Sequence, residues 1–329
     1  MTRNLSRDAR RIVAIGGGTG MHSLLSGLHH AGDELVAIIT VADDGGSSGR
    51  LRKDFEIPPP GDIRNCLVAL SDADPILGDM FQYRFEDSML QGHAFGNLFI
   101  AVLAKLTGDF RGAIERARAL LGVRDRVIPS TDQMVVLVAE HPDGSRSTGE
   151  QAISRSGKPV QRIRLEPIPP MVSREIKDVI ADAELIVLGP GSLYTSIAPN
   201  LLVPGMMDAI KKSKAPVIMV ANLMTQPGET DGFSLEDHLD AITSLPGHLV
   251  PAVILAPEDS IDPERVERYA ETGAVPVASL DQTHAPNGTR IVRARLIEPA
   301  RHVRHDPRLL ARAVHDVMDP LESEEAPRP

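Results

Sequence analysis

Short apolar segments alternate with apparent helices over most of this chain. Residues 11–15 ("RIVAI"), residues 35–41 ("LVAIITV") and the later segments "ELIVLG", "APVIMVAN" and "PAVILAP" predict strands, and most are followed by a turn and a helix. The run at 35–41 is continuously apolar, as expected for a strand that is buried on both faces. The alternation predicts a Rossmann-like α/β fold, with a mostly parallel sheet covered by helices on both faces.

The expected elements form a single domain at residues 11–320, between a flexible N-terminus at 1–10 and a charged, disordered tail at 321–329. Asp62 is placed to cap one of the helices. Residues 44–62 are expected to form a long irregular loop, because "IPPPGD" cannot lie inside a helix. Helices are predicted at residues 21–30, 62–71, 94–106, 201–213, 235–245, 263–272 and 306–318.

The middle of the chain changes character. The segments "RVIPST", "MVVLVAEHPDGSRSTG" and "QRIRLEP" predict β structure, and "PDG" supplies a hairpin turn. They indicate a small antiparallel β insertion or edge at about residues 126–168. Two more short strands are predicted at "VPVASL" and "RIVRARLI".

The composition excludes several classes of protein. The formal net charge of -10 argues against a general nucleic-acid binder, because neutralising phosphates requires a concentrated basic surface. The single cysteine, Cys66, excludes an internal disulfide framework and a multi-cysteine zinc site. No segment has the ~20 apolar residues that span a bilayer, and "MTRNLSRDARR" lacks the apolar region of a signal peptide. We therefore expect a cytoplasmic protein without membrane insertion.

The turn after the first strand, "GGGTG", is the first candidate for a ligand site. In a parallel sheet, ligands bind beyond the carboxyl ends of the strands. Gly17, Gly18 and Gly20 let the backbone approach a ligand, the helix expected to start at Met21 offers free N–H groups to an anion, and Thr19 adds a hydroxyl. The spacing matches neither G-x-G-x-x-G nor a Walker A loop. A tight turn without a ligand is the alternative.

Asp43 and Asp44 end the second predicted strand. An acidic residue at this position accepts a hydrogen bond from a ribose hydroxyl in dinucleotide-binding folds. Adjacent carboxylates also suit Mg²⁺ beside phosphates. In the third interpretation, one carboxylate caps the following turn and the other faces water.

Two later turns repeat this pattern. "GPGSLYTSIAPN" places Gly189 in a turn and the hydroxyls of Ser192 and Ser196 near a helix N-terminus. "ANLMTQPGETDG" places Asn222 and further amides and carboxylates after the next strand. These groups suit sugar hydroxyls or the edge of a base, and a polar surface loop is the alternative. The histidines are scattered, with no metal-ligand spacing, so zinc is unsupported.

A series of longer motifs resembles a known family. "GGGTG", "VADDGGSSGRLR", "PPGDIRNCLVALSD", "FQYRF", "GHAFGNL", "GPGSLYTSIAPNLLVPG", "NLMTQPGETDGFS" and "RHDP" occur in this order. Together they resemble the YvcK-type gluconeogenesis factors, a branch of the CofD-like family, over nearly the whole chain. The resemblance implies bacterial cytoplasmic proteins that bind UDP-sugars, notably UDP-N-acetylglucosamine, and that are tied to cell-wall synthesis, cell shape and growth on gluconeogenic carbon.

The resemblance also implies ligand contacts at Thr19, Asn200, Tyr269 and Arg304. A tyrosine ring offers a surface on which uracil can stack, and an arginine suits a pair of diphosphate oxygens. Members of this branch look like regulators and tend to self-associate. We therefore expect a homo-oligomeric, nucleotide-sugar-binding regulatory protein with cell-wall-synthesis proteins as candidate partners, and we assign no catalytic residue.

The sister branch, 2-phospho-L-lactate transferase, is a Mg²⁺-dependent enzyme that uses a nucleotide-activated donor. The chain departs from that branch where "GSLYTS" replaces the transferase-like "SNP". A Mg²⁺-dependent transferase is therefore the alternative function. A third is a structural protein whose ligand only stabilises the fold.

Overall fold

The computed structural model of the protein describes residues 9–87, 89–270, 272–278, 282–300 and 302–325. Residues 1–8 of the predicted flexible N-terminus and 326–329 of the predicted tail lie outside the described residues. The last helix, α13 (Pro307–Glu325), includes the first five residues of the segment 321–329 that we expected to be disordered.

Among the described residues, seven strands form a parallel sheet in the order β10-β9-β8-β7-β1-β2-β3. The strand order reverses between β1 and β7, which is the arrangement of a doubly wound sheet. The bounds are β1 Arg11–Gly16, β2 Glu34–Ile39, β3 Arg126–Pro129, β7 Leu185–Leu188, β8 Val217–Val220, β9 Val253–Pro257 and β10 Arg290–Ala294.

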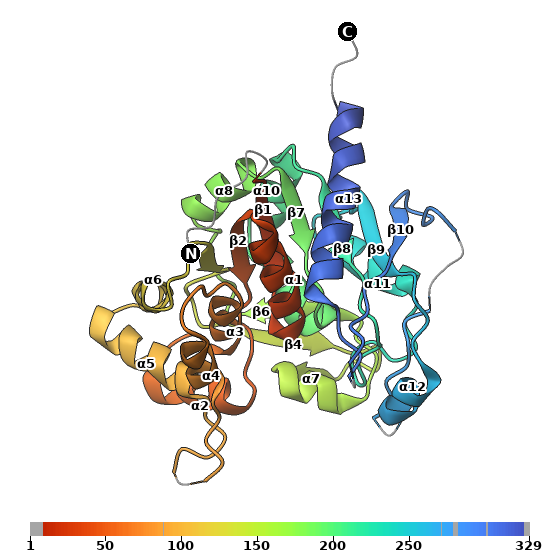
Figure 1. The fold of residues 1–329 in the computed structure, drawn as a ribbon. Coiled ribbons are helices and arrows are strands. Elements are labelled where there is room, and N and C mark those ends of the chain that lie inside the picture. Colours follow the sequence, from red (N-terminus) through yellow and green to blue (C-terminus); the bar gives the residue numbers. More distant parts are fainter. Residues whose placement is uncertain (1–8, 88, 271, 279–281, 301, 326–329) are drawn as a thin grey trace.

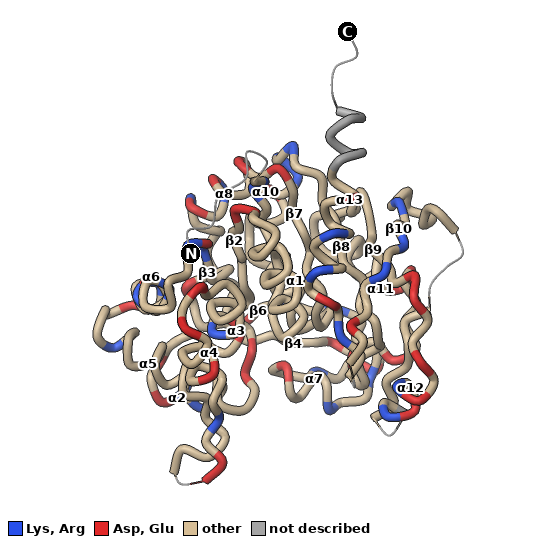
Figure 2. Tube along the Cα trace, in the orientation of Figure 1, with Lys and Arg blue, Asp and Glu red and all other residues tan. Residues whose placement is uncertain are grey.

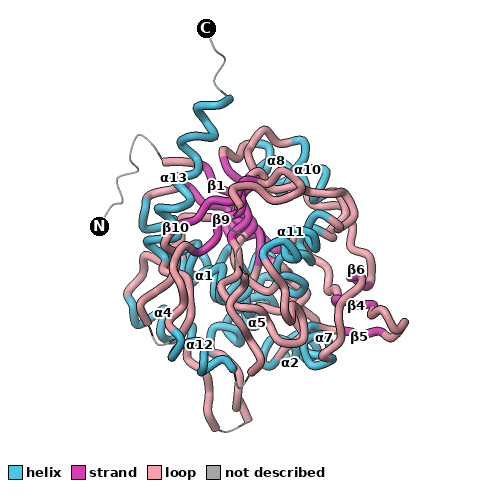
Figure 3. Tube along the Cα trace, turned by 90° about the vertical axis from the view of Figure 1, so that its right-hand side faces the viewer, coloured by secondary structure: helices cyan, strands magenta, loops and turns pink. Residues whose placement is uncertain are grey.

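Helices cover both faces of this sheet, so the predicted fold class is confirmed. Figures 1 and 3 show α1 and α13 on one face and α8, α10 and α11 on the other. The helical segments before α13 are α1 Gly18–Ala31, α2 Gly46–Phe55, α3 Gly61–Ala69, α4 Pro75–Gln82, α5 Phe95–Thr107, α6 Phe110–Leu120, α7 Glu150–Ser156, α8 Arg174–Ala181, the π-helical turn η1 Leu193–Ile197, α9 Ala198–Leu201, α10 Met206–Lys212, α11 Leu235–Thr243 and α12 Pro263–Ala270.

The central strands are buried on both faces, as their continuous apolar sequences predict. Ile12, Val13, Ala14 and Ile15 of β1 are each at most 2% exposed. On one face, α1 packs directly on α13, and a Cβ at Gly27 would lie only 1.9 Å from the carbonyl oxygen of Pro307. The absence of a side chain at position 27 therefore brings the two helices into backbone contact.

The predicted irregular loop at 44–62 was wrong, because α2 occupies most of it. The helix buries Ser47, Ser48 and Leu51 and packs against α5. Its polar, glycine-containing sequence has weak helix propensity, so the helix depends on this tertiary packing. Glu56 then takes a left-handed conformation with a φ of 54°, and the proline segment follows.

Three other local predictions were wrong. Helix α1 begins at Gly18 rather than Met21, and Pro60 rather than Asp62 precedes the first turn of α3. The helix expected at 201–213 is divided into α9 and α10, because Gly205 has a φ of 83° between them. Such a positive φ suits glycine and ends a helix.

The β insertion is smaller than predicted. Strand β3 pairs with β2 and so belongs to the parallel sheet. A separate antiparallel sheet contains β5 (Arg146–Thr148), β4 (Val136–Glu140) and β6 (Arg162–Glu166), in that order. The segment "VPVASL" forms an isolated bridge between Pro276 and Met224 instead of a strand, and its residues 279–280 lie outside the described residues.

Candidate functional site

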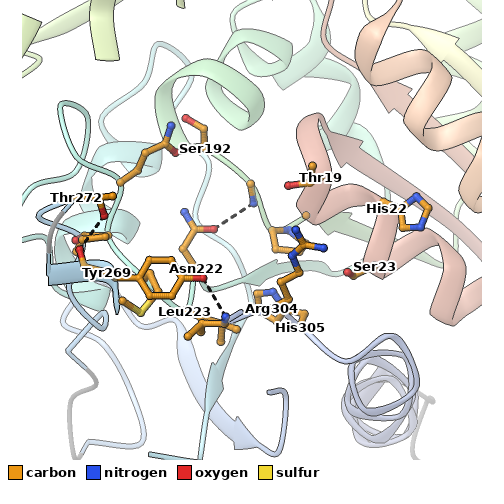
Figure 4. A pocket seen from close by; sticks show the side chains of 18 of the residues that line it. Thr19, His22, Ser23, Ser192, Asn222, Leu223, Tyr269, Thr272, Arg304 and His305 are labelled. Carbon is orange, nitrogen blue, oxygen red and sulfur yellow. Dashed lines mark hydrogen bonds between the residues drawn. The ribbon is translucent and has the colours of Figure 1, made fainter. Parts of the chain in front are cut away.

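A cavity of about 680 Å³ lies beyond the carboxyl ends of β1, β7 and β8. Its size is within the range of small-molecule sites. In Figure 4, Tyr269 and Thr272 lie on one side, Thr19 and His22 lie on the other, and Arg304 lies between them. The cavity is thus placed where the strand order reverses, the usual ligand position in a doubly wound sheet.

The structure divides the candidate site residues into two groups. Those that line the cavity are Thr19, Gly20, Ser192, Asn222, Tyr269 and Arg304. Those that do not are Gly17, Gly18, Asp43, Asp44, Gly189, Ser196 and Asn200. The turns after β1, β7 and β8 therefore meet at one cavity, whereas the turn after β2 does not join them.

Protein atoms already occupy part of the space beside the glycine turn. The N–H of Gly18 donates to the carboxyl group of Asp62. A Cβ at Gly17 would lie 2.5 Å from Oδ2 of the same carboxyl, and a Cβ at Gly20 would lie 2.2 Å from the carbonyl oxygen of Pro190. These glycines therefore permit close packing within the protein. Of the glycine turn that we expected to bind an anion, only Thr19 and Gly20 face the cavity.

Gly189 and Asn200 lie behind the cavity wall and contact other protein groups. A Cβ at Gly189 would lie 2.9 Å from Cε of Met21. Asn200 is 0% exposed, and its Nδ2 donates to the carbonyl oxygens of Gly16 at 3.0 Å and Ser196 at 2.8 Å. Asn200 therefore joins the end of β1 to η1, and its side chain does not reach the cavity.

Asp43 and Asp44 face different partners. Oδ1 of Asp43 accepts a hydrogen bond from the N–H of Gly45 at 2.7 Å, whereas Oδ1 of Asp44 accepts one from the N–H of Gln151 at 3.3 Å. Among the residues that the structure describes, no group of three or more His, Cys, Asp or Glu is arranged to hold a metal ion. Mg²⁺ binding at this pair stays a prediction.

Asp43 belongs to a group of carboxyls with Asp62 and Glu150. Burial, reinforced by the neighbouring negative charges, raises the pKa of Asp62 to about 7 and that of Glu150 to about 9. Burial also raises the pKa of Asp43, which shares a hydrogen bond with Glu150. Glu150 therefore retains its proton at neutral pH and Asp62 is only partly ionised, which lowers the negative charge of this group.

Glu229 supports the wall formed by the turns after β7 and β8. It is 3% exposed, accepts a hydrogen bond from the hydroxyl of Ser192, and accepts another from Nε2 of Gln226 at 2.8 Å. In the same wall, the N–H of Gly191 donates to Oδ1 of Asn222 at 3.1 Å. The sequence pattern grouped these polar residues, but it did not distinguish Glu229 as their support.

Tyr269 and Arg304 are held in one local unit. The hydroxyl of Tyr269 on α12 accepts a hydrogen bond from the N–H of Val303 at 3.0 Å. Because Val303 directly precedes Arg304, this bond ties the ring to the segment that carries Arg304. His305 follows and is 7% exposed, and burial lowers its pKa to about 4. His305 is therefore neutral at neutral pH.

The cavity wall includes polar residues that the sequence did not single out. His22 and Ser23 come from α1, Asn65 from α3 and Gln82 from α4. Asn65 and Gln82 lie within the motifs "GDIRNC" and "FQYRF", which were the available signal. Helical periodicity does not show that these helices meet at a cavity.

Charge is distributed differently over the molecule and over the cavity. In Figure 2, Lys and Arg are interspersed with Asp and Glu along the described parts of the chain. Among the described residues that line the cavity, Arg304 is the single Lys, Arg, Asp or Glu. No helix in the described ranges is long and apolar enough to cross a membrane.

Comparisons with known proteins confirm the resemblance in the sequence. A family model described as 2-phospho-L-lactate transferase CofD matches residues 12–297. The gluconeogenesis factor of Halalkalibacterium halodurans is 46% identical over 82% of this chain and 84% of its own length. The gluconeogenesis factor of Bacillus subtilis is 42% identical over 94% of this chain and 98% of its own length.

Solved structures agree with this assignment. A crystal structure of a protein member of the UPF0052 family from Bacillus halodurans superimposes with a TM-score of 0.90 and 42% identity, covering 93% of this chain and 99% of that chain. The chain therefore belongs to the family of 2-phospho-L-lactate transferase CofD, and the relatives that it resembles within that family are named gluconeogenesis factors.

Proposed function

We propose that the protein binds a UDP-sugar such as UDP-N-acetylglucosamine in this cavity and acts as a regulatory protein. The observation that carries the proposal is the chemistry of the described wall, in which one guanidinium, that of Arg304, stands among neutral amides, hydroxyls and apolar groups. A nucleotide-sugar has matching parts, because it contains an aromatic base, a charged diphosphate and many hydroxyls.

Each side of the cavity suits one part of such a ligand. The ring of Tyr269, fixed by its hydrogen bond to Val303, offers a flat surface to the base. The diphosphate would lie near Arg304, Thr19 and Ser192, where a guanidinium can bind two oxygens and hydroxyls can donate. The sugar would then extend towards the walls contributed by α1, α3 and α4.

A regulatory role agrees with the names of the relatives. Several proteins at 42–46% identity are named gluconeogenesis factors. We extend the role to cell-wall synthesis, cell shape and growth on gluconeogenic carbon, on the basis of the family resemblance. Growth of a Bacillus subtilis strain that lacks its own gluconeogenesis factor tests this extension. The wild-type chain should restore growth on gluconeogenic carbon, and the Arg304→Ala variant should not.

Isothermal titration calorimetry tests the binding step. We expect the wild type to bind UDP-N-acetylglucosamine, and we expect Arg304→Ala to weaken that binding by about tenfold to a hundredfold, because charge-assisted hydrogen bonds to the diphosphate are lost. Binding of uridine, which has no phosphate, should change little in this variant. Arg312→Ala is the matched control, because its side chain is 80% exposed on α13. Absence of heat with the wild type at millimolar ligand would refute the proposal.

A second candidate function is a Mg²⁺-dependent transferase. It is favoured by the name of the matched family model. Against it, Asp43 and Asp44 bond to different backbone groups instead of converging. An Asp44→Asn variant with the same nucleotide affinity as the wild type, both with and without Mg²⁺, would argue against a metal role.

A further inference from the structure

The wall of the cavity opposite Tyr269 has an ordered arrangement of polar groups. It is formed by His22 and Ser23 of α1, Asn65 of α3 and Gln82 of α4. Figure 4 shows His22 and Ser23 on the opposite side of Arg304 from Tyr269. A ligand with its base on Tyr269 and its diphosphate at Arg304 would bring its remaining part to this wall.

The amide of Asn65 has a defined orientation. Its Oδ1 accepts hydrogen bonds from Nη2 of Arg64 at 2.7 Å and from Nε2 of Gln82 at 3.3 Å. A guanidinium only donates hydrogen bonds, so the atom of Asn65 that faces it must be the oxygen. The Nδ2 group of Asn65 forms no hydrogen bond with the described residues, so it remains available as a donor at the cavity.

Arg64 is itself fixed from behind the cavity wall. It is 5% exposed, and its Nη1 donates to Oδ1 of Asn97 at 3.1 Å. Nδ2 of Asn97 in turn donates to the hydroxyl of Ser47 at 3.2 Å. Among the described residues, Arg64 forms no ion pair with a carboxylate, and its two terminal nitrogens donate to the amide oxygens of Asn97 and Asn65. A buried guanidinium used in this way holds the neighbouring side chain in one orientation.

His22 completes the arrangement. Its Nδ1 lies 3.2 Å from the backbone carbonyl oxygen of Asn65, and a carbonyl oxygen only accepts, so Nδ1 is the donor of this hydrogen bond. In the ring tautomer with its single hydrogen on Nδ1, Nε2 is an acceptor. His22 and Asn65 both line the cavity, and an acceptor and a donor on one wall suit a sugar hydroxyl, which can donate to one and accept from the other.

We propose that Asn65, held by Arg64, is the residue by which this cavity distinguishes a nucleotide-sugar from the nucleotide alone. Nδ2 of Asn65 donates to an oxygen of the sugar, and Arg64 is a positioning residue that does not touch the ligand. The inference rests on the proposed function, because it assigns the sugar to one wall of the same cavity. It identifies a determinant of specificity on helices α3 and α4, away from the turns that the sequence indicated.

The test compares the affinities for UDP and for UDP-N-acetylglucosamine in the same variants, by calorimetry. In Asn65→Ala, the affinity for UDP-N-acetylglucosamine should fall by about threefold to tenfold, the effect of one neutral hydrogen bond, whereas the affinity for UDP should not change. Tyr269→Ala is the matched contrast, because it should lower the affinity for UDP and the affinity for UDP-N-acetylglucosamine by the same factor.

Variants behind the wall separate positioning from general support of the fold. Arg64→Lys should retain part of the discrimination between the two ligands, and Arg64→Met should lose it, because methionine cannot donate to Oδ1 of Asn65. Gln82→Ala alters an exposed side chain and should reduce the discrimination without affecting folding. Gln82→Ala decides the question if Asn65→Ala does not fold.

The two proposals fail in different ways. If the wild type binds neither UDP nor UDP-N-acetylglucosamine, the proposed function is wrong and the assignment of Asn65 is wrong with it. If the wild type binds both ligands and the ratio of the two affinities is the same in Asn65→Ala and Gln82→Ala, only the assignment of Asn65 is wrong.

Discussion

Replacing Asn200 by alanine tests whether this side chain supports the fold or contacts a ligand. Its Nδ2 group supplies hydrogen bonds to the buried carbonyl oxygens of Gly16 and Ser196, so the variant leaves both oxygens without this donor. The carbonyl oxygen of Gly16 keeps its hydrogen bond from the N–H of Thr40 at 3.0 Å, so it is not left without a partner. The variant loses two hydrogen bonds, worth about 0.5–1.5 kcal/mol each. Oδ1 of Asn200 is also buried without a partner among the described residues, and its removal relieves part of this cost.

The net loss of stability should therefore be about 1–2 kcal/mol. For a chain of this length, 1 kcal/mol corresponds to roughly 2 °C, so the melting temperature should fall by about 2–4 °C. Ligand affinity, measured by calorimetry well below that temperature, should be unchanged, because the side chain is 0% exposed and does not line the cavity.

Asn222→Ala is the matched control for this experiment. Asn222 lines the cavity and accepts one hydrogen bond, from Gly191. This variant should weaken ligand binding with a smaller change in melting temperature. The structural interpretation of Asn200 would be refuted if Asn200→Ala melted like the wild type but bound UDP-N-acetylglucosamine about tenfold more weakly or worse.

Three further predictions concern stability. Gly20→Ala should destabilise the protein by about 1–3 kcal/mol, because the new Cβ would lie 2.2 Å from the carbonyl oxygen of Pro190. Gly78→Ala is the control: its Cβ would lie 3.6 Å from the nearest atom, Cγ1 of Val68, and the change should stabilise helix α4 by up to about 1 kcal/mol. Equal midpoints of denaturant unfolding in the two variants would contradict this prediction. Asp62 has a pKa of about 7 in the native protein against an ordinary 3.8, so the contribution of this carboxyl to stability is lost as the pH rises from about 4 through 7. The side chain at this position cannot ionise in the Asp62→Asn variant, so the free energy of unfolding of the variant, measured in urea, should rise relative to that of the wild type between pH 5 and pH 8. A difference between the two free energies that does not change with pH would exclude this mechanism. The hydrogen bond to Asp125, at 2.6 Å, raises the pKa of His29 above 6.5, so its contribution is complete below pH 6.5 and is lost as the pH rises through the raised value. The stability difference between the wild type and His29→Asn should therefore narrow between pH 6 and pH 9, and a widening difference would show that the sign is wrong.

The strands and the fold class could be predicted because their signal is local. The run at residues 185–188 is apolar throughout and is followed directly by a glycine turn, as expected for a short strand covered on both faces. Helix α2 could not be predicted in this way, since its stability comes from burying Ser47, Ser48 and Leu51 against distant elements.

The candidate site was predictable only where a turn directly follows a strand. Thr19, Ser192 and Asn222 each lie within four residues of the carboxyl end of a strand, so the general position of ligands in parallel sheets was enough to select them. Asn65 and Gln82 lie on helices, and their presence at the cavity depends on how α3 and α4 pack. Asp62 was expected to cap its helix, but its carboxyl instead bonds to Gly18, a contact across 44 residues that no local pattern encodes.

The reversal of strand order between β1 and β7 has a consequence for biosynthesis. Thr19 follows β1, Ser192 follows β7, and Arg304 follows β10, so residues that line one cavity are far apart in the sequence. Chains emerge from the ribosome N-terminal end first. A nascent chain therefore cannot complete the wall of this cavity until Arg304 has emerged and β10 has joined the sheet.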